Sequence, residues 1–394
     1  MRVVLALVGA IVTAVIAAWI ALAVALPKPA PPPSPPKVEP IASVAPPEPK
    51  NVASAPVTIN HPSPIPQLEV QEVEATGRQP KGAFLSHDEK RLYVTNFGEL
   101  MKKKCVSVYD ASTLALVEEI DLPGEAVEAA LSPDDKTLYV SSFWGHSVMF
   151  VDLATKTVTH DVKCGAHPKV VAASPDGTRV YVANWSGDSV TEIDTKTAEV
   201  VATHPTGKAP RGLAVAKDGT LYAASFYADS IEVYEGAARE THRKIPVCKC
   251  PRHLALSPDE KTLYISCLFA SQIHALDLAS GKVTHKASVG ASPKSIAISK
   301  DGRYVWSAEY GGTRSVSVVD TNDWTAKTFI VPGMDRGSGI AVGEGGEHAF
   351  VTGWYDAHVY RIGFAGTGGH PKEATAKINR WIGRPFSADP GDGQ

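Results

Sequence analysis

A repeat of roughly 42 residues constrains this chain more than any other feature of its sequence. Each copy contains short runs of alternating apolar and polar residues, separated by tight turns such as Pro175-Asp176-Gly177. In such turns proline presets the first turn angle and glycine accepts positive φ. One aromatic or large apolar position sets the register of the copies, which lie 41 to 46 residues apart: Tyr93, Tyr139, Tyr181, Tyr222, Tyr264, Trp306 and Phe350. Seven units of four strands each predict an all-β fold, a seven-bladed β-propeller with four-stranded blades.

A linear solenoid is the alternative architecture for a repeat of this kind. Solenoid repeats are usually shorter or helical, and no helical periodicity runs through these units. A closed ring also needs a strand that removes its exposed sheet edge. Two segments are candidates for the outer strand of the last blade: residues 68–76, which alternate apolar and acidic residues, and residues 374–382. The sequence leaves both open.

Two of the units contain a motif that resembles a known family. Tyr93-Val94-Thr95-Asn96 and Tyr181-Val182-Ala183-Asn184 are similar to the hallmark of the YVTN-repeat, or YncE-like, seven-bladed β-propellers. The resemblance covers about residues 80–362. The later units depart from the motif, because Cys267, Glu309 and Gly353 occupy the position of its asparagine. The resemblance implies the propeller fold and, for function, a family described mostly as non-enzymatic binding or surface proteins.

The amino-terminal part of the chain, residues 1–26, reads as a membrane anchor or signal segment. Residues 3–26 carry no charge, and a membrane-spanning helix needs about 20 residues. Arg2 precedes this run, which places the start in the cytoplasm and exports the remainder. A cleavable signal peptide ending near Ala23-Val24-Ala25 is the alternative. We therefore expect a single span in the cytoplasmic membrane with the propeller in the periplasm or outside the cell, or a secreted protein after cleavage.

The remaining divisions follow from composition. Residues 27–67 are rich in Pro, Ala, Ser, Lys and Glu and predict an extended, semi-rigid linker, because too few apolar residues are present to form a core. Residues 68–386 form the predicted propeller, and residues 387–394 a frayed tail.

Basic residues recur at one place in the repeat although the chain as a whole is slightly acidic. Its 39 Lys and Arg against 42 Asp and Glu give a formal net charge of −3, which argues against a general nucleic-acid binder. At the entry to the inner strand, however, six of the seven units place a cation near one mouth of the channel: Lys81, Lys169, Arg211, Arg252, Lys294 and, one place early, Arg336. This pattern predicts an anionic ligand or an acidic partner. Pairing of these cations with acids of neighbouring blades is the alternative.

The loop after the second strand adds aromatic residues to the same face. A large apolar residue lies four places beyond the aligned position in every unit: Phe97, Phe143, Trp185, Phe226, Leu268, Tyr310 and Trp354. This recurrence favours packing between blades, with Trp185, Phe226, Tyr310 and Trp354 nearest the predicted ligand. In four units a further aromatic follows directly: Trp144, Tyr227, Phe269 and Tyr355. These cannot all be buried, and an exposed cluster would mark a binding surface.

Five cysteines fall in loops of this face. Because the protein is expected to be exported, disulfides are the first expectation. Either Cys248 or Cys250 is predicted to pair with Cys267, and a second bridge between Cys105 and Cys164 is a further suggestion. A zinc or copper(I) site of Cys248, Cys250 and His253 with Cys267 nearby is the alternative. Since Cys-x-Cys is not a normal structural zinc spacing, no metal and no other cofactor is predicted.

These observations predict a non-enzymatic, membrane-tethered binding scaffold of the cell envelope. The expected partner is a protein or anionic ligand, and the propeller is expected to be monomeric. A lactonase-like hydrolase acting on a sugar lactone is the alternative, since some seven-bladed propellers resemble this repeat. Its acid and amide candidates near the mouth are Asn96, Glu128, Asn184, His253 and Glu309. The sequence contains no phosphate-binding glycine loop and no Gly-x-Ser-x-Gly elbow.

Overall fold

The computed structural model describes residues 65–98, 105–236, 239 and 241–382. The predicted anchor or signal segment, nearly all of the predicted linker and the predicted tail lie outside the described residues. Within those ranges, no helix combines the length and the apolar character that crossing a membrane would require.

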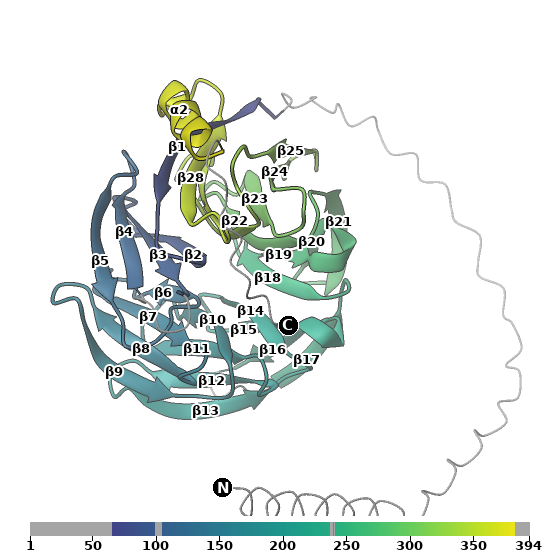
Figure 1. Cartoon of the computed structure of the whole chain (residues 1–394). Coiled ribbons are helices and arrows are strands. Elements are labelled where there is room, and N and C mark those ends of the chain that lie inside the picture. The colour runs from purple at the N-terminus through teal and green to yellow at the C-terminus, as the bar shows by residue number, and fades with distance from the viewer. Residues whose placement is uncertain (1–64, 99–104, 237–238, 240, 383–394) are drawn as a thin grey trace, which may run out of the picture. The chain divides into compact units, whose positions relative to one another are not determined.

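Seven antiparallel four-stranded sheets are arranged around a central axis (Figure 1). The first strand of each sheet lies toward the axis and the last lies at the rim. The seven-bladed propeller and its four-stranded blades are thereby confirmed, and the solenoid alternative is wrong. The first three blades consist of β2 (Pro80–Leu85), β3 (Arg91–Asn96), β4 (Cys105–Asp110) and β5 (Leu116–Asp121); β6 (Ala129–Leu131), β7 (Thr137–Ser142), β8 (Ser147–Asp152) and β9 (Thr157–Lys163); and β10 (Pro168–Ala173), β11 (Arg179–Asn184), β12 (Ser189–Asp194) and β13 (Glu199–Pro205).

The next three blades follow in chain order. They consist of β14 (Pro210–Val215), β15 (Leu221–Ser225), β16 (Ser230–Glu235) and β17 (Thr241–Pro246); β18 (Pro251–Leu256), β19 (Thr262–Cys267), β20 (Gln272–Asp277) and β21 (Lys282–Ser288); and β22 (Pro293–Ile298), β23 (Tyr304–Glu309), β24 (Ser315–Asp320) and β25 (Ala326–Ile330). Short 3₁₀ turns, η1 (Phe226–Ala228) and η2 (Leu268–Ala270), follow β15 and β19.

The seventh blade joins the two ends of the described chain. Its strands are β26 (Gly337–Val342), β27 (His348–Gly353), β28 (His358–Phe364) and, at the rim, β1 (Leu68–Ala75). β1 pairs antiparallel with β28, from Leu68 opposite Phe364 to Ala75 opposite His358. Residues 68–76 therefore supply the closing strand, as one of the two alternatives predicted.

The other candidate for the closing strand, residues 374–382, is not a strand. It belongs to α2 (Pro371–Ile382), a helix that packs against β1. The sequence contains the reason: Pro371 is at the first helical position and Glu373 is in the first turn, where proline and acidic residues favour a helix. Ala374 and Ile378, four residues apart, are buried in one cluster with Val73 of β1, as expected for one face of a helix.

The recurrent Ser-Pro-Asp-Gly turn between the first two strands has a local chemical cause. In the third blade the Ser174 hydroxyl donates to Asp176 Oδ1 over 2.5 Å, and the Thr178 amide donates to the same oxygen over 3.0 Å. Gly177 takes a φ of 72°, which glycine adopts without steric cost. Equivalent serine–aspartate pairs recur at Ser86–Asp88, Ser132–Asp134, Ser257–Asp259 and Ser299–Asp301. In these five blades the turn therefore fixes where the second strand begins.

The core lies between neighbouring blades rather than within them. Tyr139 and Phe150 of the second blade, for example, pack in one buried cluster with Val171, Val180 and Val182 of the third. A single blade cannot bury this surface alone, and the stacked ring is the arrangement that buries it.

Candidate anion-binding site

The predicted cations lie in irregular segments at the start of the inner strands. In β10 the pairing moves from Pro168–Asn184 directly to Val171–Val182, so Lys169 falls in a β-bulge. A bulge leaves a residue unpaired and re-aims its side chain. The same register shift follows the first residue of β2, β14, β18 and β22, and the residue after that proline is Lys81, Arg211, Arg252 and Lys294.

These five cations meet at one cavity. Its volume is about 20 Å³, enough for roughly one water-sized group. No ion pair joins any of the five side chains to an acid within the part of the chain that the structure describes. The pairing with neighbouring blades that was the alternative is therefore not seen. The residues that line the cavity are Lys81, Glu128, Lys169, Val170, Arg211, Arg252, His253, Lys294 and Ser295.

The second and seventh blades break the pattern in different ways. β6 begins its pairing at Ala129–Val140 without an initial register shift, and the preceding Glu128 supplies the single carboxyl group of the cavity lining. Arg336 does not line the cavity: it is exposed, with its guanidinium over the rings of Tyr310, at 5.3 Å, and Tyr355, at 4.9 Å. Arg336 was predicted to lie at the channel mouth with the other five cations. The structure instead places it outside the cavity that those five line.

Ser338 occupies the bulge of the seventh blade instead of a cation. Lys294 Nζ donates to the Ser338 hydroxyl, which in turn donates to the carbonyl oxygen of Lys81 over 3.1 Å. This chain of hydrogen bonds connects the sixth, seventh and first blades and fixes the position of Lys294 relative to Lys81.

Aromatic rings alternate with the cations around the cavity. Trp185 lies 4.8 Å from Lys169 Nζ and 5.3 Å from the Arg211 guanidinium, measured from the ring centroid. Phe226 lies 4.4 Å from the same guanidinium. A cation over an aromatic face within about 6 Å is attracted by the ring quadrupole. These contacts hold the two cations in place without neutralising them.

The same arrangement recurs on the opposite side of the ring. Trp354 lies 5.6 Å from Lys81 Nζ and 5.1 Å from Lys294 Nζ, and Tyr310 lies 4.9 Å from Lys294 Nζ. The four predicted aromatic residues of the site, Trp185, Phe226, Tyr310 and Trp354, therefore all contact a predicted cation.

A second group of aromatics lies outside the first and is exposed. The exposed fractions are 59% for Trp144, 57% for Tyr227, 68% for Phe269 and 41% for Tyr355. Each lies against an aromatic of the inner group: Phe143 with Trp144 at 4.8 Å, Phe226 with Tyr227 at 4.8 Å and with Phe269 at 6.4 Å, and Trp354 with Tyr355 at 6.5 Å. The prediction that these four rings cannot all be buried is confirmed, and all four are exposed. They form an apolar rim around the cationic centre.

Crowding of like charges away from water lowers the pKa values of the basic groups. Burial, with repulsion from the neighbouring arginines, lowers the pKa of Lys81 to about 8, and burial with repulsion from Arg211 lowers that of Arg252 to about 9. Burial and the neighbouring cations hold the pKa values of Lys169 and Lys294 well below their usual range. Both effects disfavour the charged form of a base. An anion in the cavity would raise these pKa values again, because it favours the charged form of each base.

Three buried nitrogen atoms around the cavity lack a hydrogen-bond partner among the described residues. They are Trp185 Nε1, Arg211 Nε and His253 Nδ1. Burial and the nearby Arg252 lower the pKa of His253 to about 4, so its ring is neutral at pH 7. Buried polar groups in native proteins are usually paired. The unpaired N–H groups of Trp185 and Arg211 fit a ligand that brings acceptor oxygens.

The five hydrolase candidates are not brought together. Asn184 is fully buried inside its blade, where its Nδ2 donates to the hydroxyls of Ser189 at 3.1 Å and Thr191 at 2.8 Å. Asn96 has the same position in the first blade and Glu309 in the sixth, and both are fully buried. Of the candidates, Glu128 and His253 reach the cavity. Neither was among the predicted binding residues, although Glu128 belongs to the second unit, which has no cation at this place in the repeat.

The cysteines form one disulfide within the described residues. Cys248 is bonded to Cys267, with their Cα atoms 5.8 Å apart, which confirms one of the two pairings predicted for Cys267. Cys105, Cys164 and Cys250 are thiols, so the suggested second bridge between Cys105 and Cys164 is wrong. His253 lines the cavity instead of joining these cysteines.

Comparisons with known proteins agree with this architecture. Residues 161–256 match the family model described as "YNCE-like beta-propeller". Among solved structures, one titled Kuenenia stuttgartiensis Hydrazine Synthase matches with a TM-score of 0.65 and 19% sequence identity, over 79% of this chain and 99% of that chain. At this identity the likeness concerns the fold alone. No curated protein sequence matches. The chain is thus a seven-bladed β-propeller, and its residues 161–256 are similar to the YNCE-like β-propellers.

Proposed function

We propose that the propeller is a non-enzymatic binding platform that captures an acidic segment of a partner protein at this mouth of the channel. The observation that carries the proposal is the convergence of five basic side chains and one carboxyl group on a single cavity. Two like unit charges 6 Å apart repel by roughly 3 kcal/mol at an effective dielectric constant of 20. A carboxylate entering the cavity relieves this repulsion, and the unpaired donors of Trp185 and Arg211 meet its oxygens.

The shape of the site favours a protein segment over a small free anion. The cavity admits about one small group, as the tip of a glutamate or aspartate side chain would require. Around it lie the four exposed rings of Trp144, Tyr227, Phe269 and Tyr355. Aromatic side chains are enriched at protein interfaces, and here they would cover apolar residues that flank the acidic one. The site therefore offers both positive charge and apolar contact to one segment of a partner protein.

The proposal includes a location in the cell envelope, with the propeller attached through its amino-terminal segment. Support comes from the uncharged residues 3–26 that follow Arg2, and from the Cys248–Cys267 disulfide, because disulfides persist in oxidising compartments. A linker of residues 27–67 would give the binding face reach from the membrane.

The test is capture of an acidic peptide by the purified protein. A fluorescein-labelled octapeptide of alternating leucine and glutamate is titrated with the protein and followed by fluorescence anisotropy at 50 and 300 mM salt. We expect the double variant Lys169→Glu/Arg211→Glu to weaken binding at least tenfold, since half-buried cations become repelling charges, and binding by the parent protein to fall at the higher salt.

A matched control is Lys136→Glu, whose side chain is 79% exposed in the turn before β7, away from the cavity. This variant should bind like the parent, and a leucine–lysine peptide should not bind. Equal affinities of the double variant and the parent for the acidic peptide would overturn the proposal.

A further inference from the structure

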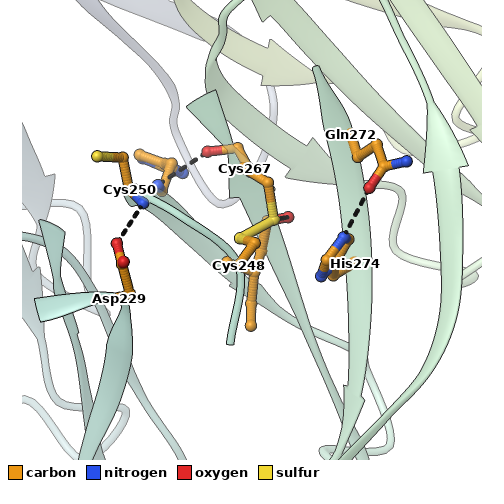
Figure 2. Close-up of a disulfide and its surroundings, with 9 residues drawn as sticks. Asp229, Cys248, Cys250, Cys267, Gln272 and His274 are labelled. Carbon is orange, nitrogen blue, oxygen red and sulfur yellow. Dashed lines mark hydrogen bonds between the residues drawn. A yellow bond between two sulfur atoms is a disulfide. The ribbon is translucent and has the colours of Figure 1, made fainter. Parts of the chain in front are cut away.

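A group of metal-ligating atoms lies around the disulfide, in the fifth blade and separate from the cationic cavity. The sulfurs of Cys248 and Cys267 and a ring nitrogen of His274 all lie within 4.8 Å of one another. Figure 2 shows the imidazole of His274, on β20, beside the disulfide that joins Cys267 at the end of β19 to the loop before β18. All three residues are buried, with exposed fractions of 8%, 0% and 5% in that order.

The hydrogen bonding of the His274 imidazole leaves one ring nitrogen available as a ligand. Its Nε2 lies 3.0 Å from Gln272 Oε1 (Figure 2). An amide oxygen only accepts hydrogen bonds, so Nε2 is the protonated nitrogen and Nδ1 keeps its lone pair. Nδ1 is buried and has no hydrogen-bond partner among the described residues. Ligating histidines typically show this second-shell hydrogen bond on the opposite nitrogen.

We propose that Cys248, Cys267 and His274 form a redox-gated metal site. In the oxidised protein the sulfurs are bonded to each other and the site is closed. A dithiol reductant supplies two electrons and two protons: the S–S bond breaks, two thiols form, and the reductant becomes the disulfide. A thiophilic d¹⁰ ion then displaces the two thiol protons and binds both thiolates and His274 Nδ1.

Two ions satisfy this chemistry, and they differ in charge and ligand number. Zinc(II) with two thiolates is neutral, which suits a buried site, but zinc prefers four ligands. Copper(I) is soft and monovalent, and thiolate ligands select for it. Cys248 and Cys267 belong to one apolar cluster with Leu254, Ile265 and Leu276, and the buried His274 lies beside them. Such a shell restricts water and strengthens the bonds between the metal and its thiolates.

The experiment uses the full chain in two states, as isolated and after reduction with dithiothreitol, which is then removed without air. Zinc(II) is titrated against a chromophoric zinc indicator and copper(I) against bicinchoninate. We expect one equivalent of at least one of these ions to bind the reduced protein and none to bind the oxidised protein at this site. Bound metal should also protect Cys248 and Cys267 from alkylation by iodoacetamide, read by mass spectrometry.

Variants separate this site from other thiols. His274→Ala should weaken binding at least tenfold, and Gln272→Ala by about 10- to 100-fold through loss of the orienting hydrogen bond. Cys250→Ser removes a neighbouring thiol outside the group and should leave the affinity unchanged. Thermal melts of the oxidised variants check that each is folded. Binding that is insensitive to reduction, or equally strong in folded His274→Ala and Gln272→Ala, would refute the metal site.

Discussion

Glu309 shows how one residue can conflict with its place in the fold. In the first and third blades this position is an asparagine, and the Asn184 amide donates to two hydroxyls. Glu309 places a carboxyl group there, fully buried, with the hydroxyls of Ser307, Ser315 and Ser317 around it. Burial raises the pKa of Glu309 to about 8. The carboxyl group is therefore protonated in the folded protein at neutral pH.

This pKa predicts a pH-dependent stability. The folded pKa lies above the ordinary value of 4.5, so between about pH 5 and pH 8 the unfolded chain ionises Glu309 while the folded chain does not. The free energy of unfolding should fall across this window by on the order of 4 kcal/mol from this residue. Glu309→Gln keeps the site neutral and should remove that part of the dependence. Urea unfolding at pH 5 and pH 8 measures it.

The exposed Glu199 on β13 supplies the control. Glu199→Gln should retain the pH dependence of the parent protein. If Glu309→Gln also retained all of it, the protonated state of the buried carboxyl would be disproved.

At the scale of elements, the ring is closed by two segments from opposite ends of the described chain. β1 completes the seventh blade, and α2 packs on β1. Lys377 Nζ of α2 donates to the Val73 carbonyl over 3.1 Å and pairs with Glu72 at 3.1 Å. Ile378 is buried in the same cluster as Val73. The helix thus covers a rim strand that would otherwise have one unsupported side.

Removing the buried anchor of α2 should loosen this closure first. Ile378→Ala is expected to cost about 2–4 kcal/mol of unfolding free energy, as for other large-to-small substitutions in a core. Hydrogen exchange should accelerate in β1 and β28 more than in β10–β13. Lys372→Ala, at an exposed position of the same helix, should change neither quantity. Uniform acceleration over all seven blades would contradict a local closure by α2.

At the scale of the whole molecule, the near-symmetry of the seven blades gathers positive charge at one cavity. Bulges at equivalent places in five blades bring to one cavity side chains whose successive members are 41 to 88 residues apart in sequence. The chain as a whole has a net charge of −3, so this positive centre is a product of the ring and not of the composition.

The charge state of the cavity predicts how binding should depend on pH. Lys81 has a pKa of about 8, and Lys169 and Lys294 lie well below their usual range. An entering carboxylate favours the protonated lysines, so binding takes up protons and weakens as pH rises from 7 to 9. Anisotropy titrations of the leucine–glutamate peptide across this range measure the slope, up to about tenfold per pH unit for each proton taken up. An affinity that is constant or rises would contradict the proposed role of these lysines.

The sequence predicted the fold because its signals are local and repeated. A Ser-Pro-Asp-Gly turn closes on itself through Asp176, and alternation of apolar residues defines each strand without reference to distant parts of the chain. These five residues occupy the same place in their units: Lys81, Lys169, Arg211, Arg252 and Lys294. The sequence therefore also predicted that they lie at one mouth of the channel. The helix of residues 371–382 was missed because its helical signals, Pro371 and Glu373, were outweighed by the expectation of a closing strand.

By itself, the sequence determined the seven units, their strands and the place of the cations within each unit, since these depend on contacts between near neighbours. The tertiary structure decided which cations converge, that Glu128 faces them while Arg336 does not, that β1 closes the ring, and that Cys267 pairs with Cys248 beside His274. These depend on where bulges and loops from different blades meet when the ring closes, and no spacing along the chain specifies that meeting.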